Sequence, residues 1–363
     1  MLPYYLLIII PFYLTTVEYL IQPNQSCLST KKTTTNNSIV VFFVIWGMML
    51  SLRHSTKCGF DLPNYQYYFS ITSRLDFLDV FSFHSTEQLY FAFNWLIAQI
   101  YPDFRLFLIV TSLLCSGVVG WFYYKESELA PLTILLFVTN ACFVMFYSGL
   151  RQSLAMLFVI PAYYMTKQKR LVPFILIVLL AKCFHNSATV MLLLYPIYHT
   201  PLRSKHFILV ILLVVFFFIF KSQIFTTVVP FLNDKYSGAV IGETNGYTVW
   251  IMFILLLVYS FLVFDDSKMD AECLGLRNIL VIMTLIQGFA PIFATAMRMN
   301  YYFILIFPII IPKLMNHPKV GYENMIQFSK WFMILLLTIF FFVSRVSSGN
   351  PSLGAYPYVA FWE

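Results

Sequence analysis

The stretch VLLAKCFHNSATVMLLLYP, residues 178–196, places a lysine and a histidine inside an otherwise apolar run. Soluble proteins rarely contain so apolar a run, and membrane-spanning segments rarely accept ionisable side chains because charge is costly in hydrocarbon. The stretch therefore predicts either two short membrane helices or one long broken helix, interrupted near Lys182 and His185, where polar side chains reach a membrane surface.

The composition extends this interpretation to the whole chain. Of its 363 residues, 60% are hydrophobic and 11% are charged, against roughly 25% charged residues in soluble domains. No polar stretch is long enough to form a soluble domain, so we predict an all-α polytopic membrane protein with one membrane domain over residues 1–363. The six cysteines include no CxxC pair and support neither a zinc site nor a disulfide framework.

The apolar runs give the expected helices. A membrane-spanning helix needs about 20 mostly apolar residues, and we expect roughly 10–13 such helices with uncertain ends. The runs lie at residues 2–21, 39–52, 104–124, 131–147, 150–165, 171–184, 188–198, 207–220, 247–264, 278–294, 301–311 and 331–343.

The basic residues predict an orientation, because cytoplasmic loops are enriched in lysine and arginine. If KQKR at residues 167–170 is cytoplasmic, counting helices places every other basic loop on the same side. Those loops are residues 125–127, 203–206, 264–277 and 312–319. The opposite side then receives an extracytoplasmic or re-entrant segment at 53–100, a loop at 221–247 and the C-terminal residues.

Three ionisable residues stand at predicted helix ends on this outer side. The guanidinium of Arg151 can bind a phosphate group bidentately, or it can extend to the membrane interface. His185 can donate hydrogen bonds or carry protons in a polar cleft, or it can be satisfied by a neighbouring carbonyl. Arg298 begins another helix, and two such arginines with helix N-termini would make an anion site, although interfacial anchoring remains open.

The segment after residue 57 supplies carboxylates and tyrosines. Asp61 and Glu87 can act as a general base for an alcohol, whereas Asp76 and Asp79 fit a solvated loop. We find no GxSxG, HExxH or P-loop motif and no DxD pair. We therefore expect no metal and no cofactor, and the dispersed positive charge does not indicate nucleic acid.

Five ordered pieces of this chain resemble the EpsG-type family of Wzy-like bacterial polysaccharide polymerases. The pieces are GFDLPNYQYYF with EQLYFAFNWL, then YSGLRQSLAMLFVIPAYYMTKQKR, LLAKCFHNSATVMLLLYPIY, RMNYYFILIFPIIIP and YPYVAFWE. They run from about Gly59 to the C-terminus. The block that joins the arginine helix, the basic loop and FHNSA is the most specific of them.

The resemblance implies a GT-C-like, multi-pass glycosyltransferase of the bacterial cytoplasmic membrane, acting on its outer face without metal. It would join oligosaccharide units carried on undecaprenyl diphosphate, beside a flippase and a chain-length regulator of the same pathway. For that chemistry we expect diphosphate binding by Arg151 and Arg298, with Asp61, Glu87 or His185 as catalytic groups. The residues expected to bind substrate are Tyr65, Gln152 and Tyr302.

Two other functions remain open. A flippase for the same lipid-linked units also needs cations in the membrane, but it is expected to contain an internal repeat, and we find none. A ligase or another transferase with a lipid-linked donor would carry similar arginines, so the sequence separates it poorly from a polymerase.

Overall fold

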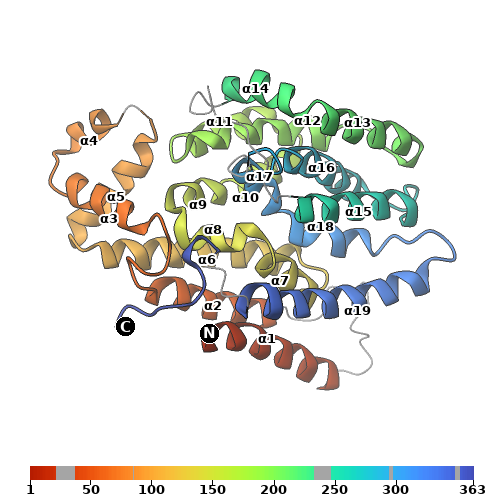
Figure 1. Cartoon of the computed structure of the whole chain (residues 1–363), viewed down its shortest axis with the longest axis horizontal. Helices are drawn as coiled ribbons and strands as arrows, with labels where there is room; N and C mark the ends of the chain where they lie inside the picture. The colour runs from red at the N-terminus through yellow and green to blue at the C-terminus, as the bar shows by residue number, and fades with distance from the viewer. Residues whose placement is uncertain (22–36, 85, 233–246, 294–296, 348–351) are drawn as a thin grey trace. The chain divides into compact units, whose positions relative to one another are not determined.

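The computed structural model describes residues 1–21, 37–84, 86–232, 247–293, 297–347 and 352–363, and these residues are helical without any strand. Two isolated bridges, Arg53 with Ala360 and Phe264 with Pro318, are the extended contacts among them. The prediction of an all-α polytopic membrane protein is confirmed (Figure 1).

Several helices of the described residues have the length and composition to cross a membrane. Two are continuous, Phe104–Glu126 and Glu323–Val346. Three bent pairs qualify if each pair is one span, and four shorter apolar helices accompany them. The count of 10–13 spans stays a prediction, because several predicted spans are interrupted.

The chain forms two compact units. Unit 1 contains Met1–Ile160, Cys183–His185 and Ser329–Glu363, and unit 2 contains Pro161–Lys182 and Asn186–Phe328. The helices that begin in unit 1 are α1 (Leu2–Ile21), α2 (Asn37–Leu52), α3 (Leu62–Thr72), α4 (Phe77–Phe83), α5 (Gln88–Ile100), α6 (Phe104–Glu126), α7 (Ala130–Val138), α8 (Ala141–Ser148), α9 (Leu150–Leu157), α10 (Val159–Lys167), the π-helix η5 (Phe341–Val346) and the 3-10 turn η6 (Ser352–Gly354). The single membrane domain over residues 1–363 stays a prediction.

The helices that begin in unit 2 include one long 3-10 segment, η1 (Asn186–Leu193). The others are α11 (Leu171–Lys182), α12 (Leu194–Tyr198), η2 (Ser204–His206), α13 (Phe207–Ile219), α14 (Lys221–Leu232), α15 (Tyr247–Val263), α16 (Ala271–Gln287), α17 (Met297–Ile304), α18 (Phe307–Leu314) and α19 (Glu323–Phe340). Of the expected loop at 221–247, residues 221–232 form α14 and residues 233–246 lie outside the described residues.

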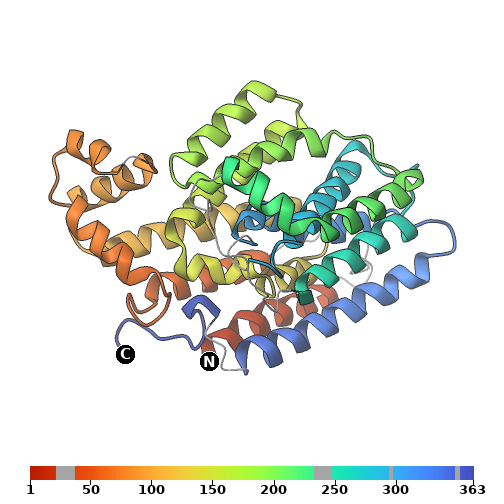
Figure 2. The ribbon, with the colours of Figure 1, turned by 45° about the horizontal axis from the view of Figure 1, so that its top comes forward.

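The core of unit 1 is an aromatic cluster on α2, α7 and α8. The ring of Trp46 is fully buried, and its centroid lies 5.1 Å from that of Phe137 and 5.2 Å from that of Phe146. Helix α2 packs along α6 and α1, as Figures 1 and 2 show. Aromatic pairs contribute stability beyond that of their buried area. This cluster therefore stabilises the packing of α2 and α7 against α8, the helix that precedes α9.

The expected span at residues 131–147 is bent by 59° between α7 and α8. Thr139 Oγ1 donates to the Leu135 carbonyl at 2.6 Å, and Asn140 Nδ2 donates to the Leu136 carbonyl at 2.9 Å. Side chains that bond the preceding turn in this way compete with the backbone ladder and bend helices. Arg345 Nη2 donates to the Thr139 carbonyl at 3.2 Å, so a cation satisfies a backbone group that the bend releases.

The expected segment at 53–100 consists of three short helices, α3, α4 and α5, which cluster beside the start of α6 (Figures 1 and 2). Trp95 Nε1 on α5 donates to the Leu75 carbonyl at 3.0 Å and its ring lies 5.1 Å from that of Phe77. These contacts hold the turn between α3 and α4 against α5. The extracytoplasmic position of the segment stays a prediction.

The C-terminal residues are bonded to the chain that precedes α3. His54 N donates to Val359 O at 2.8 Å, and Phe60 N donates to Leu353 O at 3.1 Å. Gly59 has φ +121°, and a Cβ atom there would lie 2.2 Å from the Tyr147 carbonyl oxygen. Since only glycine adopts this backbone with so little space, Gly59 fixes the approach of residues 59–61 to the end of α8.

Two departures from the predicted helices of unit 2 have local causes in the sequence. The expected helix 278–294 begins seven residues earlier, as α16, because Asp270 caps it by accepting a hydrogen bond from Cys273 N at 2.7 Å. The expected span 301–311 is divided into α17 and α18, which are bent by 51°. Pro308 opens α18, where its missing N–H is tolerated.

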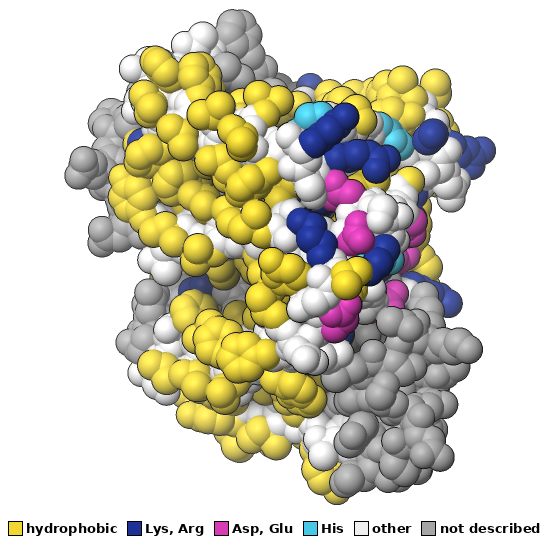
Figure 3. All heavy atoms as spheres, turned by 90° about the vertical axis from the view of Figure 1, so that its right-hand side faces the viewer, with side chains coloured by type: hydrophobic (Ala, Val, Ile, Leu, Met, Phe, Trp, Pro, Cys, Tyr) yellow, Lys and Arg dark blue, Asp and Glu magenta, His cyan; other side chains and the backbone are white. Residues whose placement is uncertain are grey.

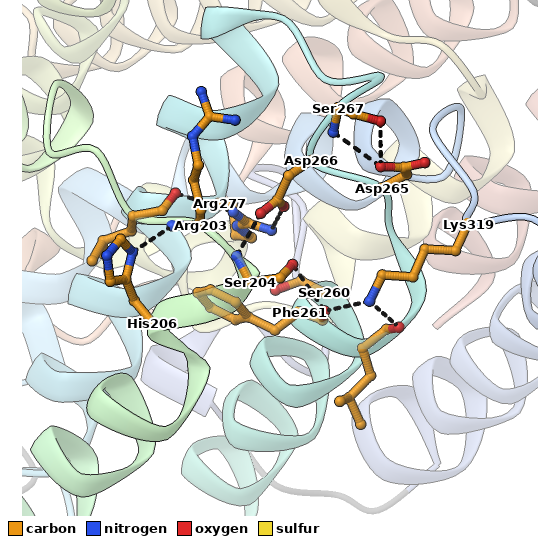
Figure 4. Close-up of polar contacts among 12 residues, drawn as sticks. Arg203, Ser204, His206, Ser260, Phe261, Asp265, Asp266, Ser267, Arg277 and Lys319 are labelled. Carbon is orange, nitrogen blue, oxygen red and sulfur yellow. Dashed lines mark hydrogen bonds and ion pairs between the residues drawn. The ribbon is translucent and has the colours of Figure 1, made fainter.

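Figure 4 shows side-chain contacts among three of the predicted basic loops of unit 2, at residues 203–206, 264–277 and 312–319. Arg277 Nη1 donates to Asp266 Oδ1 at 2.6 Å, and Ser204 N donates to Asp266 Oδ2 at 2.5 Å. Lys319 Nζ donates to the carbonyls of Phe261 and Leu262. The carboxylate of Glu272 binds Lys167 and Lys313 and accepts from the Tyr163 hydroxyl at 2.8 Å. Four loops that the charge pattern placed on one side are therefore neighbours.

Gly59→Ala is expected to lower the free energy of unfolding by about 2 kcal/mol or more and so to lower the melting temperature of the purified protein. The added Cβ would strike backbone rather than a flexible side chain, so little relaxation is available. The matched control is Gly117→Ala on α6, where a Cβ meets nothing within 4 Å. An unchanged melting temperature in Gly59→Ala would contradict the proposed close packing.

Asp266→Asn is expected to destabilise the protein at neutral pH and to have little effect in acid. Burial alone would raise the pKa of Asp266, but hydrogen bonds from Arg277 and Ser204 outweigh it and hold that pKa below its ordinary value. A carboxylate with a lowered pKa in the folded state adds stability above its unfolded pKa, about 3.9, and loses it as the pH falls through the folded value. Thermal unfolding at pH 7 and near pH 3 measures the difference, with Asp79→Asn as an exposed control. An effect that is equal at both pH values would oppose this electrostatic account.

Candidate functional site

The candidate site of unit 1 is built on one buried carboxylate with two partners. Arg151 Nη1 lies 2.5 Å from Glu87 Oε2, and His185 Nδ1 lies 2.5 Å from Glu87 Oε1. The Glu87 side chain is 7% exposed, whereas those of Arg151 and His185 are 25% and 27% exposed. The carboxylate is therefore withdrawn, and its two partners retain access to solvent.

The backbone aims Glu87 at these partners in an unusual conformation. Glu87 precedes α5 with φ +61° and ψ +34° and makes no side-chain cap. Left-handed backbone is uncommon for a residue other than glycine and costs of order 1 kcal/mol or more. Leu89 N donates instead to the Cys183 carbonyl at 3.1 Å, so residues 183–185 cap α5 and free the Glu87 side chain for the ion pairs.

The break in the opening stretch brings His185 to Glu87. Helix α11 ends at Lys182, residues Cys183–His185 pack with unit 1, and η1 begins at Asn186. An ionised carboxylate can only accept hydrogen bonds, so His185 Nδ1 carries the hydrogen that Glu87 receives. The other ring nitrogen, Nε2, is then the one that can accept a proton, as in other carboxylate–histidine pairs.

Arg151 is the second residue of α9 and lies among aromatic rings. Its Cζ lies 5.5 Å from the centroid of Tyr65 and 5.8 Å from that of Tyr90. A cation at a helix N-terminus opposes the helix dipole, and Glu87 supplies the compensating charge. Arg151 Nε is buried without a hydrogen bond among the described residues, so the guanidinium has donors beyond the one given to Glu87.

Asp61 is joined to the chain just before Arg151. Ser148 Oγ donates to Asp61 Oδ2 at 3.1 Å, and Asp61 N donates to Ser148 Oγ at 3.1 Å. Asp61 also precedes α3, the helix that presents Tyr65 to Arg151. Asp61 therefore connects the two elements that carry the site, and Gln152 lies buried beside Arg151 on α9.

Arg298 and Tyr302 belong to unit 2. Arg298 is the second residue of α17 and half-buried. Tyr302 is buried, and its hydroxyl lies 2.9 Å from Ser187 Oγ on η1. The structure thus brings Glu87, Arg151, His185 and Tyr65 together, with Asp61 bonded nearby. The roles assigned to all of these residues from the sequence stay predictions.

Sequence reasoning missed two neighbours of the site. Tyr90 follows Glu87 by three residues, so one helical turn places it beside Arg151, and this spacing was a usable signal. Ser148 carried no signal, because a serine before a helix is commonly a cap. Asp76 and Asp79 lie on or before α4 and form no ion pair among the described residues.

No group of three or more His, Cys, Asp or Glu side chains with the spacing of a metal site occurs among the described residues. The chemistry available to Glu87, Arg151 and His185 is anion binding and proton transfer. Arg151 can neutralise negative charge that develops on a leaving group. His185, oriented by Glu87, can accept a proton from a hydroxyl.

A double-mutant cycle on Glu87 and Arg151 is expected to give a coupling free energy of about 2 kcal/mol. Breaking a buried pair leaves an uncompensated charge, so each single change to glutamine is costly and the double change costs less than their sum. Equilibrium unfolding of purified wild type, Glu87→Gln, Arg151→Gln and the double variant measures it. Additive effects would show that the two side chains do not interact.

Comparisons with known proteins place these residues in a family context. The sequence model of the EpsG family matches residues 36–360. No curated protein matches this chain, and no solved structure matches it.

Proposed function

The chain belongs to the EpsG family, and from this premise we propose that it is a polysaccharide repeat-unit polymerase. Membership indicates a membrane glycosyltransferase of the polymerase type. The finer proposal is that donor and acceptor are oligosaccharides on undecaprenyl diphosphate, joined at the outer face of the bacterial cytoplasmic membrane. The observation that carries it is the buried Glu87 carboxylate shared by Arg151 and His185.

The reaction needs charge stabilisation at one end and a base at the other. An acceptor hydroxyl oxygen attacks the anomeric carbon of the donor, and the bond from that carbon to the diphosphate oxygen breaks. Arg151 binds the departing diphosphate, because a guanidinium matches phosphate oxygens and offsets their charge. The leaving diphosphate is attached to a lipid, so the donor is not a nucleotide sugar. A lipid-linked donor is suited to a site in a membrane protein.

His185 Nε2 accepts the proton of the attacking hydroxyl in this proposal, and Glu87 orients the ring through Nδ1. Glu87 is a poorer base than we expected from the sequence, since its two oxygens already accept from Arg151 and His185. Asp61 holds the Ser148 turn and α3 in place. Tyr65 lines the path of the sugar beside Arg151, with Gln152 behind it. Arg298 and Tyr302 belong to unit 2, and their roles in binding diphosphate and sugar stay proposals from the sequence.

Surface glycan length in cells that lack the gene tests the proposal. Complementation with wild type should restore long chains, whereas Arg151→Ala and His185→Ala should leave single repeat units on the outer face. Rate losses of about 10²–10⁴ are expected for the base and about 10²–10³ for the cation. Gel profiles of the polysaccharide and mass spectra of lipid-linked intermediates provide the measurement, with membrane levels of each variant matched.

The controls separate the roles within the site. Asp79→Ala, on the same outer segment, should keep long chains. Asp61→Asn and His185→Gln identify the base, because the residue whose removal abolishes transfer at every pH carries the proton. Long chains in both Arg151→Ala and His185→Ala would refute the site. Repeat units that accumulate facing the cytoplasm would show a flippase, and long chains retained on their lipid carrier would show a ligase.

A further inference from the structure

Unit 2 carries a second charged surface whose acidic residues are already occupied. Figure 3 shows a face on which Lys and Arg side chains gather with a few acids beside a broad hydrophobic area. Asp266 is bonded to Arg277, and Glu272 is bonded to Lys167 and Lys313. Arg277 is fully buried and Lys313 is 11% exposed. These inner contacts pair three cations with two acids and bind the loops together.

Four outer cations of the same loops are exposed: Lys169, Arg170, Arg203 and Lys205. None of them forms an ion pair with an acid within the part of the chain that the structure describes. Figure 4 shows the Arg203 side chain extending away from the Asp266–Arg277 pair. The outer layer is therefore a positive surface over an inner layer whose cations are paired with acids.

Side-chain contacts hold the two loops that carry these cations. His199 Nε2 donates to the Thr166 carbonyl at 3.0 Å, which joins the two loops directly. Asn278 Nδ2 donates to Thr200 O at 2.6 Å, and Arg277 Nη2 donates to Leu202 O at 3.1 Å. Since Arg277 and Asn278 are fully buried, the loop between α12 and η2 is anchored from below.

Lys169 occupies a position that favours glycine. Its φ is +58°, Lys169 N donates to Thr166 O, and Arg170 N donates to Met165 O at 2.9 Å. This pattern is the Schellman motif that ends a helix, where glycine is the usual residue at the left-handed position. A lysine there costs backbone strain that glycine would avoid. In return, its side chain places a positive charge at this position.

Apolar side chains follow both loops directly. Leu171 and Val172 at the start of α11 are 48% and 68% exposed, and Ile208 and Leu209 at the start of α13 are 72% and 63% exposed. Helices α11 and α13 present further exposed leucines along their length. Basic side chains thus lie next to exposed apolar side chains at the first turn of each helix. This combination is typical of the boundary between lipid headgroups and acyl chains.

We propose that this surface of unit 2 binds the headgroups of anionic phospholipids, with Lys169, Arg170, Arg203 and Lys205 as ligands of the phosphate groups. Charge complementarity favours an anion, and the adjoining apolar turns favour one that carries acyl chains. An acidic protein would require polar contacts where Leu171, Val172, Ile208 and Leu209 are exposed. Each basic residue near such a surface adds attraction that salt weakens.

The test uses the purified full-length chain in neutral detergent with dioctanoyl phosphatidylglycerol as the probe and melting temperature as the readout. Phosphatidylglycerol should raise the melting temperature in a saturable manner, and phosphatidylcholine of equal chain length should not. Inorganic phosphate and polyglutamate should have no comparable effect, and 0.5 M salt should weaken binding. The paired variants Lys169→Gln with Arg170→Gln, and Arg203→Gln with Lys205→Gln, should each weaken it roughly 20-fold.

Two further variants keep the experiment decisive. Lys169→Gly removes a charge and relieves the left-handed backbone, so it should maintain or raise the melting temperature without lipid and weaken lipid binding about fivefold. Arg74→Gln with Lys182→Gln removes two exposed cations elsewhere and should bind as wild type does. Equal binding by all variants, an equal response to phosphatidylcholine, or equal stabilisation by phosphate or polyglutamate would overturn the proposal.

Discussion

The ion-pair geometry around Glu87 is the constraint on which the site of unit 1 depends. A carboxylate that is 7% exposed is costly to bury unless both oxygens are bonded. Arg151 and His185 supply those bonds at 2.5 Å each, and this requirement fixes three elements relative to one another. The left-handed backbone at Glu87, the first turn of α9 and the break after α11 all serve the same pair of contacts.

Interrupted helices recur where this chain must accommodate polar groups. Thr139 and Asn140 bend one span, and Arg345 satisfies the carbonyl that the bend releases. The break after Lys182 releases His185 to reach Glu87. A membrane protein can expose backbone groups only where other protein groups or a polar cavity receive them. Polar side-chain contacts therefore occur at the interruptions of otherwise apolar helices.

The same logic separates the charges of unit 2 into two layers. Buried cations such as Arg277 need a carboxylate and have one in Asp266, whereas the exposed cations can use solvent or an external anion. The buried layer supplies a rigid support, and the exposed layer keeps its charge. Glu87 plays the corresponding part in unit 1, where it accepts from Arg151 and leaves that side chain 25% exposed.

The sequence alone determined the all-α membrane fold, because a composition with so few charges cannot form a soluble domain, and it located the break at His185. It also singled out Arg151 and His185 as costly polar residues and Glu87 as a candidate base. Their association could not be predicted, since residues 87, 151 and 185 are far apart in the chain and no local pattern encodes a contact at such separation. The bend at Thr139 and Asn140 was missed because side chain to backbone bonds of this kind look like ordinary polar positions in an apolar run. Only the tertiary structure decided that Glu87 is a shared acceptor rather than a free base, because burial and the positions of both partners set how its oxygens are used.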